Sequence, residues 1–454
     1  MTMAISHTFR GGVHPPEAKH LTEHEPIRVM PAPRRVRLPL RQHLGVPARA
    51  IVQVGDRVAE GQPVAEAAGF VSAPVHAPIA GEVTFIGPRL HPGGLRCESI
   101  EIEARDSGID DAPWPPPPWR LPNARPDYEQ ASPAELKALI QAAGLVGLGG
   151  AAFPTHVKLS PPAGKTIDLL VINGAECEPF LTCDHRTMLE ETDDVVHGVR
   201  ILQRALGAPR VIVGIEQNKP DAIAKLTAAF AGHADVAVVG CRVKYPQGAE
   251  KQLIQALTGR EVPPPPGLPL DVGVVVQNVG TAAAVARAVR EGILLIERVL
   301  TVSGSAVCRP SNLRVRLGTP LPEVVGFCGG LSSPPTRVIA GGPMMGAALG
   351  DLDVPVVKAT SGLLFFTRDD VPDPVPHPCI RCGRCGEACP LGLQPSELAL
   401  RVEIVDLDTA EALHLQECME CGSCAYICPS NRWLVQTLRL GKAKVHDRKS
   451  KARS

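Results

Sequence analysis

The chain has 454 residues, which is enough for two to four domains. Its 47 Lys and Arg balance 47 Asp and Glu, so the net charge is zero and gives no support for nucleic-acid binding. Apolar residues make up 44%, as in an ordinary globular protein, and 46 Pro with 43 Gly indicate many turns. No apolar run approaches the length of a membrane span, and residues 1–6 lack a signal-peptide core.

The first part of the chain is expected to be β-rich. After an N-terminal extension (1–26), residues 27–105 alternate Val, Ile and Ala with Gly and Pro at short intervals. The pattern V-x-x-G-D-x-V-x-x-G-Q, which starts at Val52, and the later A-P-x-x-G-x-V resemble the barrel-sandwich fold of lipoyl and biotinyl carriers. Those carriers present a modifiable Lys at a hairpin tip. The corresponding stretch, 69–76, has no Lys, so a carrier function is not expected.

A Pro-rich linker (106–129) precedes a predicted α/β domain over 130–297. Ser132 begins its first helix as an N-cap, with Pro and then Glu in the first turn. Apolar runs suit buried parallel strands, and a helix is predicted over 185–206. This alternation predicts a doubly wound, Rossmann-like sheet. The four predicted strands are 169–172, 211–213, 236–239 and 272–276.

The C-terminal part is divided by composition. Residues 298–350 predict a small β module, 351–378 a linker, and 379–436 a mostly helical domain with a helix-like segment at 396–416. The basic tail, 437–454, is interpreted as solvated, or else as a contact for anionic lipid or an acidic partner. The expected fold class is therefore multidomain α/β and α+β.

Two cysteine runs of the form C-x2-C-x2-C-x3-C-P define the C-terminal domain. Bacterial two-cluster ferredoxins hold two 4Fe–4S clusters with this run, and the fourth Cys of each run binds the other cluster. Structural zinc is the alternative, but zinc ribbons use two separated pairs for one metal. The spacing predicts Cys379, Cys382, Cys385 and Cys428 as ligands of cluster one, and Cys418, Cys421, Cys424 and Cys389 as ligands of cluster two.

Four elements of the α/β domain are candidates for ligand binding. A glycine-rich loop with Gly147, Gly149 and Gly150 leads to Lys158, a suitable partner for phosphate. The second element, N-G-A-E-C-E-P from Asn173, follows a strand at the edge where open α/β sheets bind ligands, and its acidic residues suit ribose hydroxyls. The third is Gly248 to Glu250. The fourth runs from Gln277 to Thr281 and enters a helix whose N-terminus suits a phosphate.

In this order, the four elements resemble the FMN- and NADH-binding subunit of respiratory complex I. With the N-terminal G-G-V-H-P-P-E, the carrier-like domain and the cysteine runs, the chain resembles the C subunit of Rnf (Rsx) electron-transport complexes over about residues 10–440. The resemblance implies FMN-binding residues, namely Gly147, Gly149, Gly150, Lys158, Asn173, Gly248, Glu250, Gln277, Asn278 and Thr281. It also places Phe153, Glu176 and Glu178 in the cofactor site, with Phe153 and Glu178 next to NAD(H).

The chain departs from the complex I pattern at several positions. Leu148 stands where complex I has Arg, Ala152 where it has Gly, and Ala175 where it has Asp. No Phe follows the run Pro263–Pro266, where complex I has an aromatic residue that stacks on adenine. These changes affect the adenine site more than the FMN site.

The resemblance further implies a soluble-ligand-binding β-grasp-like module at 298–350. It implies an NAD-linked flavin and iron–sulfur oxidoreductase at the cytoplasmic face of the bacterial inner membrane, with the other Rnf subunits as partners and ferredoxin or flavodoxin as indirect partners. No catalytic side chain is expected, because the flavin carries the chemistry. Two alternatives remain: a flavin and iron–sulfur cobalamin reductase, and a relay subunit with a degenerate nucleotide site.

Overall fold

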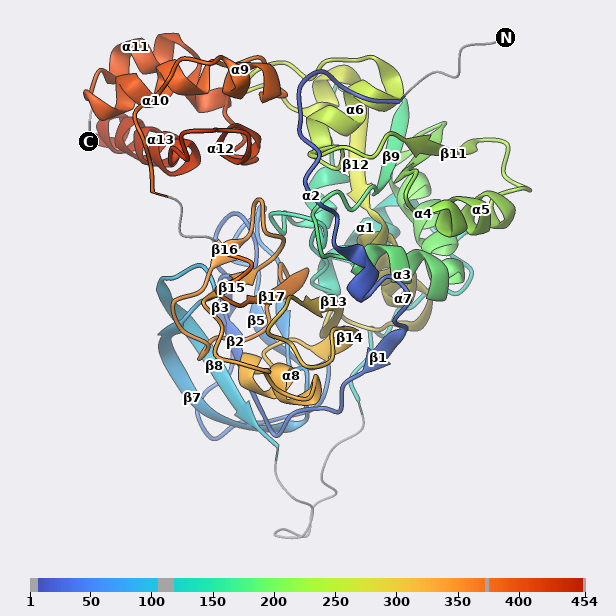
Figure 1. Ribbon diagram of the computed structural model, residues 1–454. Coiled ribbons are helices and arrows are strands. Elements are labelled where there is room, and N and C mark those ends of the chain that lie inside the picture. The colour runs from blue at the N-terminus through green and yellow to red at the C-terminus, as the bar shows by residue number, and fades with distance from the viewer. Residues whose placement is uncertain (1–6, 105–117, 372–374, 452–454) are drawn as a thin grey trace.

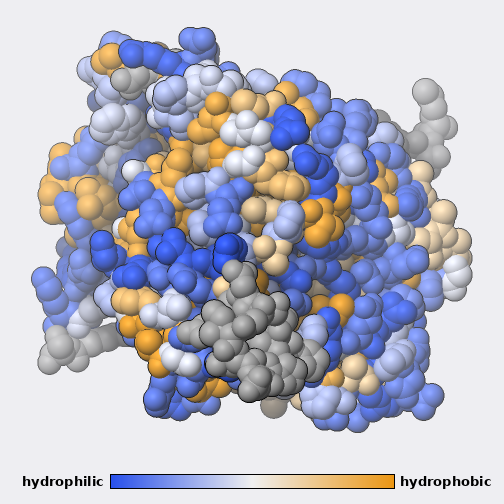
Figure 2. All heavy atoms as spheres, turned by 90° about the horizontal axis from the view of Figure 1, so that it is seen from below, coloured by the Kyte–Doolittle hydropathy of each residue, from blue (hydrophilic) through white to orange (hydrophobic). Residues whose placement is uncertain are grey.

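The computed structural model describes residues 7–104, 118–371 and 375–451. A helical C-terminal domain lies at one end of the molecule, above the β-rich parts and beside the α/β domain (Figure 1). On the face seen in Figure 2, polar and apolar side chains are interspersed. Within the described ranges, no helix is long and apolar enough to cross a membrane.

Two small antiparallel sheets form the N-terminal β domain. One has the order β2-β8-β7-β4 and the other β3-β5-β6. Alternate side chains of two neighbouring strands point into the core: Val36 and Leu38 from β2, and beside them Ile100 and Ile102 from β8. All four are fully buried between the sheets. The strands are β2 (Arg35–Pro39), β3 (Arg49–Ala50), β4 (Arg57–Val58), β5 (Pro63–Glu66), β6 (Val75–His76), β7 (Gly81–Leu90) and β8 (Arg96–Glu103).

The α/β domain is built on a parallel sheet of order β11-β10-β9-β12, so all four predicted strands are present. The predicted cap is also present, since Ser132 and Glu135 form a reciprocal capping box. The strands are β9 (Leu169–Gly174), β10 (Val211–Glu216), β11 (Val236–Cys241) and β12 (Val274–Asn278). The helices are α1 (Pro133–Ala142), α2 (Thr155–Lys158), α3 (Cys183–Glu190), α4 (Thr192–Leu206), α5 (Pro220–Ala229), α6 (Glu250–Thr258), η2 (Pro269–Val272) and α7 (Val279–Glu291).

The single helix predicted over 185–206 is wrong. The chain leaves helical geometry at Glu191, where φ is −117° and ψ is 36°, and two helices, α3 and α4, result. The second helix starts with Asp193 and Asp194 in its first turn, where negative charge favours a new N-terminus. The break lets α3 direct its N-terminus toward the end of β9.

A six-stranded mixed sheet, order β1-β14-β13-β17-β15-β16, forms the third part. This sheet includes strands on both sides of the range 298–350 that is expected for the small β module. Strand β1 lies in the range expected for the first β domain, yet it pairs with β14. Strand β17 lies in the range expected as a linker, but all five of its residues are buried between β13 and β15. The elements are β1 (Ile27–Val29), β13 (Glu297–Ser303), β14 (Ser311–Arg316), α8 (Leu321–Phe327), β15 (Arg337–Ala340), β16 (Ala347–Ala348) and β17 (Gly362–Phe366).

The C-terminal domain is helical, as predicted. The segment 396–416 is not one helix, because Val405 takes a left-handed φ of 62° between α10 and α11. Most of the basic tail belongs to α13, whose Leu438 and Val445 are buried in the domain core. The helices are α9 (Arg384–Ala388), α10 (Pro395–Glu403), α11 (Leu407–Ala412), η3 (Leu415–Glu417), α12 (Ser423–Tyr426) and α13 (Leu434–Lys451).

Four cations of α13 form ion pairs with acids of the same domain. Arg439 and Lys442 pair with Glu420, and Arg448 and Lys449 pair with Glu411. Residues 437–451 therefore belong to a packed helix and not to a free tail.

Candidate flavin and iron–sulfur sites

The glycine-rich loop lies against the N-terminus of α7. The backbone N–H of Leu148 donates to Thr281 Oγ1 at 2.9 Å, and the Arg298 guanidinium donates to the Leu148 carbonyl at 3.2 Å. A Cβ added to Gly149 would stand 2.5 Å from the Asn278 side chain, so only glycine fits there. At Gly150 an added Cβ would meet nothing within 4 Å, which leaves one side of the loop open.

The carboxyl ends of β9 and β12 bring the other predicted residues to this loop. Asn173 and Asn278 are direct partners in the parallel ladder. Asn173 donates to the Gly248 carbonyl at 2.8 Å, and Asn278 caps α7 by accepting from two backbone N–H groups. Lys158 donates to Glu250 at 2.7 Å. The side-chain nitrogen of the buried Gln277 has no hydrogen-bond partner among the described residues.

These features fit a flavin nucleotide. The loop has an open side with glycine at the close approach, a lysine for a phosphate, and a buried amide group that lacks a partner within the described ranges. Phe153 is half-buried at the end of the loop. The structure thus gathers the predicted FMN residues at one sheet edge, which is the usual ligand-binding edge of an open α/β sheet.

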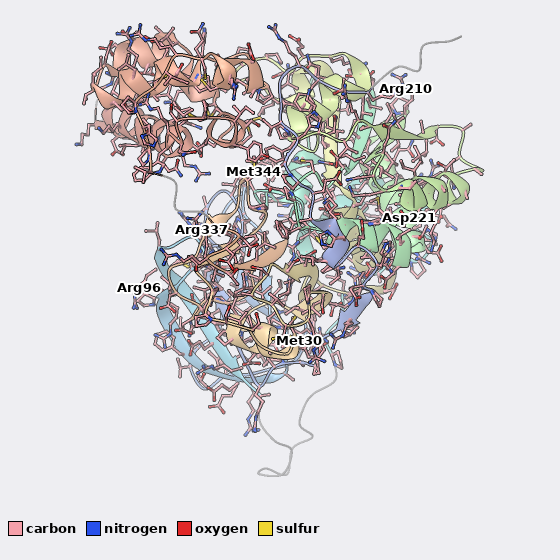
Figure 3. All side chains as sticks on the ribbon, in the orientation of Figure 1. Met30, Arg96, Arg210, Asp221, Arg337 and Met344 are labelled. Atoms are coloured by element: carbon pink, nitrogen blue, oxygen red, sulfur yellow. The ribbon has the colours of Figure 1, made fainter. Side chains whose placement is uncertain are left out.

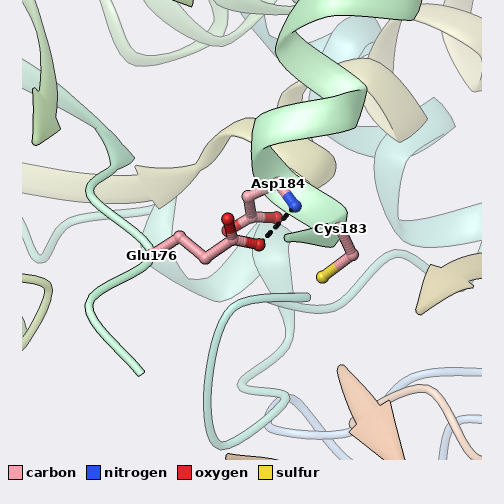
Figure 4. Close-up of side chains that lie close together, drawn as sticks. All are labelled: Glu176, Cys183 and Asp184. Atoms are coloured by element: carbon pink, nitrogen blue, oxygen red, sulfur yellow. Dashed lines mark hydrogen bonds between the residues drawn. The ribbon is translucent and has the colours of Figure 1, made fainter. Parts of the chain in front are cut away.

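Behind the end of β9, Glu176 and the partly buried Asp184 form an acidic pair (Figure 4). Glu176 accepts from the backbone N–H of Asp184 at 2.6 Å and thereby caps α3. Burial and then the charge of Glu176 raise the pKa of Asp184 to about 7, while Asn278 donates to Asp184 at 2.6 Å. Asp184 was not among the predicted residues. No pattern in the sequence indicates it, because its contacts with Glu176 and Asn278 form only in the folded chain.

Lys19 is a second residue that the sequence did not indicate. It comes from the N-terminal extension, is 5% exposed, and donates to three carbonyls of the acidic loop after β9. The acceptors are Glu176 at 2.9 Å, Glu178 at 3.0 Å and Leu181 at 2.6 Å. The extension therefore fixes the backbone of the loop that carries the predicted nucleotide-binding acids.

Glu178 faces the six-stranded sheet. Its two carboxylate oxygens accept from the backbone N–H groups of Met344 and Met345, at 3.0 and 2.9 Å. Burial is the main cause that raises the pKa of Glu178 to about 7, and the two hydrogen bonds oppose it. In this structure the carboxylate thus holds a loop of the neighbouring module.

The second cysteine run and the last cysteine of the first run converge. Cys389, Cys418, Cys421 and Cys424 line one pocket, which also has Leu393, Val435 and Leu438 in its wall. Four thiols around one cavity fit a 4Fe–4S cluster, and the participation of Cys389 is what the crossed ligation requires. The other predicted set is more open: Cys379 and Cys382 are exposed, Cys385 and Cys428 half-buried. The Arg432 guanidinium lies near Cys379, and the two groups interact electrostatically.

The buried cysteine set adjoins the flavin domain. Tyr245, between β11 and α6, is 2% exposed and donates its hydroxyl to the Cys421 carbonyl at 2.6 Å. Val13 pairs with Tyr245 through two backbone hydrogen bonds, and Gly12 donates to the Ala388 carbonyl. Met344 packs into the same cluster of buried side chains (Figure 3). The N-terminal extension, the flavin domain and the six-stranded sheet therefore meet at the wall of cluster two.

Four family models match the chain in sequence. They are the "RnfC Barrel sandwich hybrid domain" over residues 7–107, the "Nuo51 FMN-binding domain" over 140–287, the "SLBB domain" over 299–348 and the "4Fe-4S dicluster domain" over 378–432. They confirm the predicted barrel-sandwich, flavin, soluble-ligand-binding and ferredoxin parts, and with them FMN and 4Fe–4S clusters as cofactors.

A solved structure, that of an NAD+-reducing [NiFe]-hydrogenase in the H2-reduced state, shares the fold. It has a TM-score of 0.51 and 21% identity, over 70% of this chain and 63% of that chain. At this identity the likeness supports the fold alone.

Curated relatives cover most of the chain, and each is the C subunit of an oxidoreductase complex. The relative from the proton-translocating ferredoxin:NAD(+) oxidoreductase complex of Clostridium ljungdahlii is 48% identical over 87% of this chain and 84% of its own length. The relative from the ion-translocating oxidoreductase complex of Rhodobacter capsulatus is 46% identical over 98% and 85%. The relative from the Na(+)-translocating ferredoxin:NAD(+) oxidoreductase complex of Acetobacterium woodii is 42% identical over 98% of both chains. The chain thus belongs to the RnfC family, the C subunits of ion-translocating ferredoxin:NAD(+) oxidoreductase complexes.

Proposed function

We propose that this chain is the subunit at which such a complex exchanges electrons with NAD(H). FMN accepts or donates a hydride with NAD(H) and single electrons with iron–sulfur clusters, so one chain that holds both cofactors can join two-electron to one-electron chemistry. The observation that carries the proposal is the Tyr245–Cys421 hydrogen bond, which joins the flavin domain directly to the ligand loop of cluster two. The family membership leaves no support for the cobalamin-reductase alternative.

In this proposal the flavin phosphate lies at the glycine-rich loop and the α7 N-terminus, near Lys158. Asn173 and Gln277 face the flavin ring, and the acidic pair of Glu176 and Asp184 supports the floor of the site. Phe153 lies at the open end, where the nucleotide enters. The protein contributes position, charge and exclusion of water, and no side chain acts as acid or base.

The two cysteine sets have different places in the proposed path. Cluster two, with Cys421 and Cys424 buried, is the inner set and adjoins the flavin domain. Cluster one, with Cys379 and Cys382 exposed, is the outer set and faces a partner. We place the chain at the cytoplasmic face of the membrane, where NAD(H) is available, bound to the other subunits of the complex and indirectly linked to ferredoxin or flavodoxin.

Anaerobic titration with NADH tests the proposal. The flavin- and cluster-loaded protein should lose flavin absorbance first and cluster absorbance after it. A protein that binds no flavin, or whose flavin NADH leaves oxidised, would contradict the proposal.

One observation favours a second function, that of a relay subunit with a degenerate nucleotide site. Both oxygens of Glu178 are occupied by the Met344–Met345 backbone and not directed at an open pocket. The same titration separates the two functions. A relay subunit would bind flavin and accept electrons from dithionite, yet NADH would change neither its absorbance nor its fluorescence.

A further inference from the structure

A run of backbone N–H groups in the glycine-rich loop is free. The N–H groups of residues 149–152 donate to no other described residue, whereas that of Leu148 is bound to Thr281 Oγ1. Residues 149–151 are exposed, and Ala152 has a left-handed φ of 52°. Successive amides in a turn of this kind form a concave site for an anion. The loop therefore offers its amides to a phosphate group.

The other candidate partners of a phosphate are already engaged. The Lys158 ammonium pairs with Glu250 at 2.7 Å, so its charge is largely compensated. At the start of α7, two backbone N–H groups are bound by the side chain of Asn278. Residues 147–157 contain no Lys or Arg. A phosphate at the free amides therefore needs a counter-charge from another part of the chain.

Arg298 on β13 brings such a charge to the back of the loop. It is 3% exposed, and its guanidinium donates to the Leu148 carbonyl at 3.2 Å. Its other two acceptors are also carbonyls, those of Val299 and Lys358. No acid of the described residues forms an ion pair with it, although the neighbouring Glu297 pairs with three other arginines. A buried cation without an acid partner is costly, and a bound anion offsets this cost.

The Leu148–Gly149 peptide carries the effect of this charge to the free amides. In a trans peptide the C=O and N–H groups point in opposite directions, so the N–H of Gly149 faces away from Arg298. A cation at the carbonyl polarises the peptide and strengthens its N–H as a donor. Lys358 places a second buried ammonium group on the Gly144 carbonyl, but burial lowers its pKa to about 7. Above pH 7, Arg298 is therefore the lasting charge behind the loop, because a guanidinium does not lose its proton.

We propose that Arg298 is the residue by which the site selects FMN over riboflavin, the flavin without a phosphate. Its charge compensates the phosphate through the Leu148–Gly149 peptide, so it is a positioning residue and not a direct contact of the flavin. The six-stranded sheet thereby contributes to the cofactor preference of the α/β domain. The proposal rests on the proposed function only in that the flavin phosphate lies at the glycine-rich loop.

The test compares two flavins that differ only in the phosphate. The full-length, cluster-loaded protein is freed of flavin and titrated with FMN or with riboflavin at pH 8, where the phosphate is a dianion. Flavin fluorescence gives the two dissociation constants, and their ratio, riboflavin over FMN, measures phosphate selection. The variants are Arg298→Gln, which keeps an amide donor without the charge, and Arg298→Lys, which keeps the charge.

Arg290→Gln is the matched control. Arg290 lies in the last turn of α7, about 14 Å along the helix axis from Thr281, and its partner Asp194 is 4.0 Å away. The substitution removes one arginine charge from the same domain without touching the glycine-rich loop.

Asp184→Asn is a second arm with the opposite sign. Asp184 accepts from Asn278 beside the loop, and its charge interacts with that of Arg298. Its pKa is about 7, so its carboxyl group is ionised at pH 8. Removing this negative charge leaves more of the Arg298 field for the phosphate.

We expect Arg298→Gln to lower the selection ratio about tenfold, because a unit charge is lost at a buried position of low effective dielectric constant. Its riboflavin affinity should stay close to that of the wild type. Arg298→Lys should keep most of the ratio and Arg290→Gln all of it. Asp184→Asn should raise the ratio about threefold, by the same electrostatic argument with the sign reversed.

Equal losses of FMN and riboflavin affinity in Arg298→Gln would mean that Arg298 only clamps the loop, and would overturn the proposal. An unchanged ratio in Arg298→Gln, an equal fall in Arg290→Gln, or a ratio that Asp184→Asn fails to raise would overturn it too. If Arg298→Gln does not fold, Asp184→Asn decides in its place. NADH takes no part in these titrations, so failure of NADH to reduce the flavin would contradict the proposed function and leave this result standing.

Discussion

Lys19→Met tests how strongly the N-terminal extension holds the acidic loop. Lys19 donates to the carbonyls of Glu176, Glu178 and Leu181, and it is almost fully buried. Met keeps the length of the side chain and removes the ammonium group. Each carbonyl that loses its donor without access to water costs roughly 1 kcal/mol, so three together cost ~3 kcal/mol.

The loss should be local, because the chain has several domains and does not unfold as one unit. Hydrogen exchange read by mass spectrometry reports the opening of one segment at a time. At tenfold for each 1.4 kcal/mol, the amides of residues 174–184 should exchange about 100-fold faster in the variant. Flavin affinity should fall in parallel, since Glu176 caps α3 beside the flavin site.

Lys165→Met is the matched control. Lys165 pairs with Asp271 at the surface, where an ion pair contributes about 1 kcal/mol at most. This control should leave exchange in residues 174–184 unchanged. Unchanged exchange of that loop in Lys19→Met, or an equal change in both variants, would refute the inference that the extension fixes the loop.

Three further predictions concern the clusters and the module interface. Cys389→Ser should halve the iron content of the protein. Adding Cys421→Ser to this variant should remove no more iron, whereas adding Cys379→Ser should remove the rest. The reverse pattern would contradict crossed ligation. Arg432→Gln should lower the midpoint potential of cluster one by up to about 60 mV in an EPR-monitored titration, since it removes a positive charge near Cys379 worth roughly 1.4 kcal/mol. Glu178 binds more protons folded than unfolded between pH 4.5 and about 7, so its contribution to stability falls as pH rises through this window. The local opening free energy of residues 342–346, read by hydrogen exchange in Glu178→Gln relative to wild type, should therefore rise from pH 5 to pH 8 by up to about 3 kcal/mol, and a constant difference would contradict the raised pKa.

Local patterns predicted much of the fold. The four parallel strands and the Ser132 capping box follow from short-range apolar runs and cap chemistry, and the structure contains all of them. The glycine-rich loop and the ends of β9 and β12 meet because carboxyl ends of parallel strands share one edge. The cysteine spacing likewise predicted that Cys389 joins the second run, and the structure brings it there.

Long-range contacts explain what the sequence could not predict. The helix break at Glu191 lies beside β1 and β14, where Glu190 accepts from the Ile27 backbone N–H and Glu191 pairs with Arg314, and no Pro or Gly marks it. Strand β17 is a short apolar run that becomes a strand only because β13 and β15 offer edges on both sides. Lys19 reaches its acceptors across more than 150 residues of sequence. Such contacts depend on the tertiary fold and leave no periodic signal.

The order in which NADH reduces the centres tests the proposed electron path most directly. Rapid mixing of the loaded protein with NADH, followed by freeze-quench EPR and absorbance, resolves the flavin and the two clusters in time. We predict that the flavin is reduced first, the cluster of the buried cysteine set second and the cluster of the exposed set last. Reduction of the exposed cluster before the buried one, or cluster reduction in a flavin-free protein, would contradict this path.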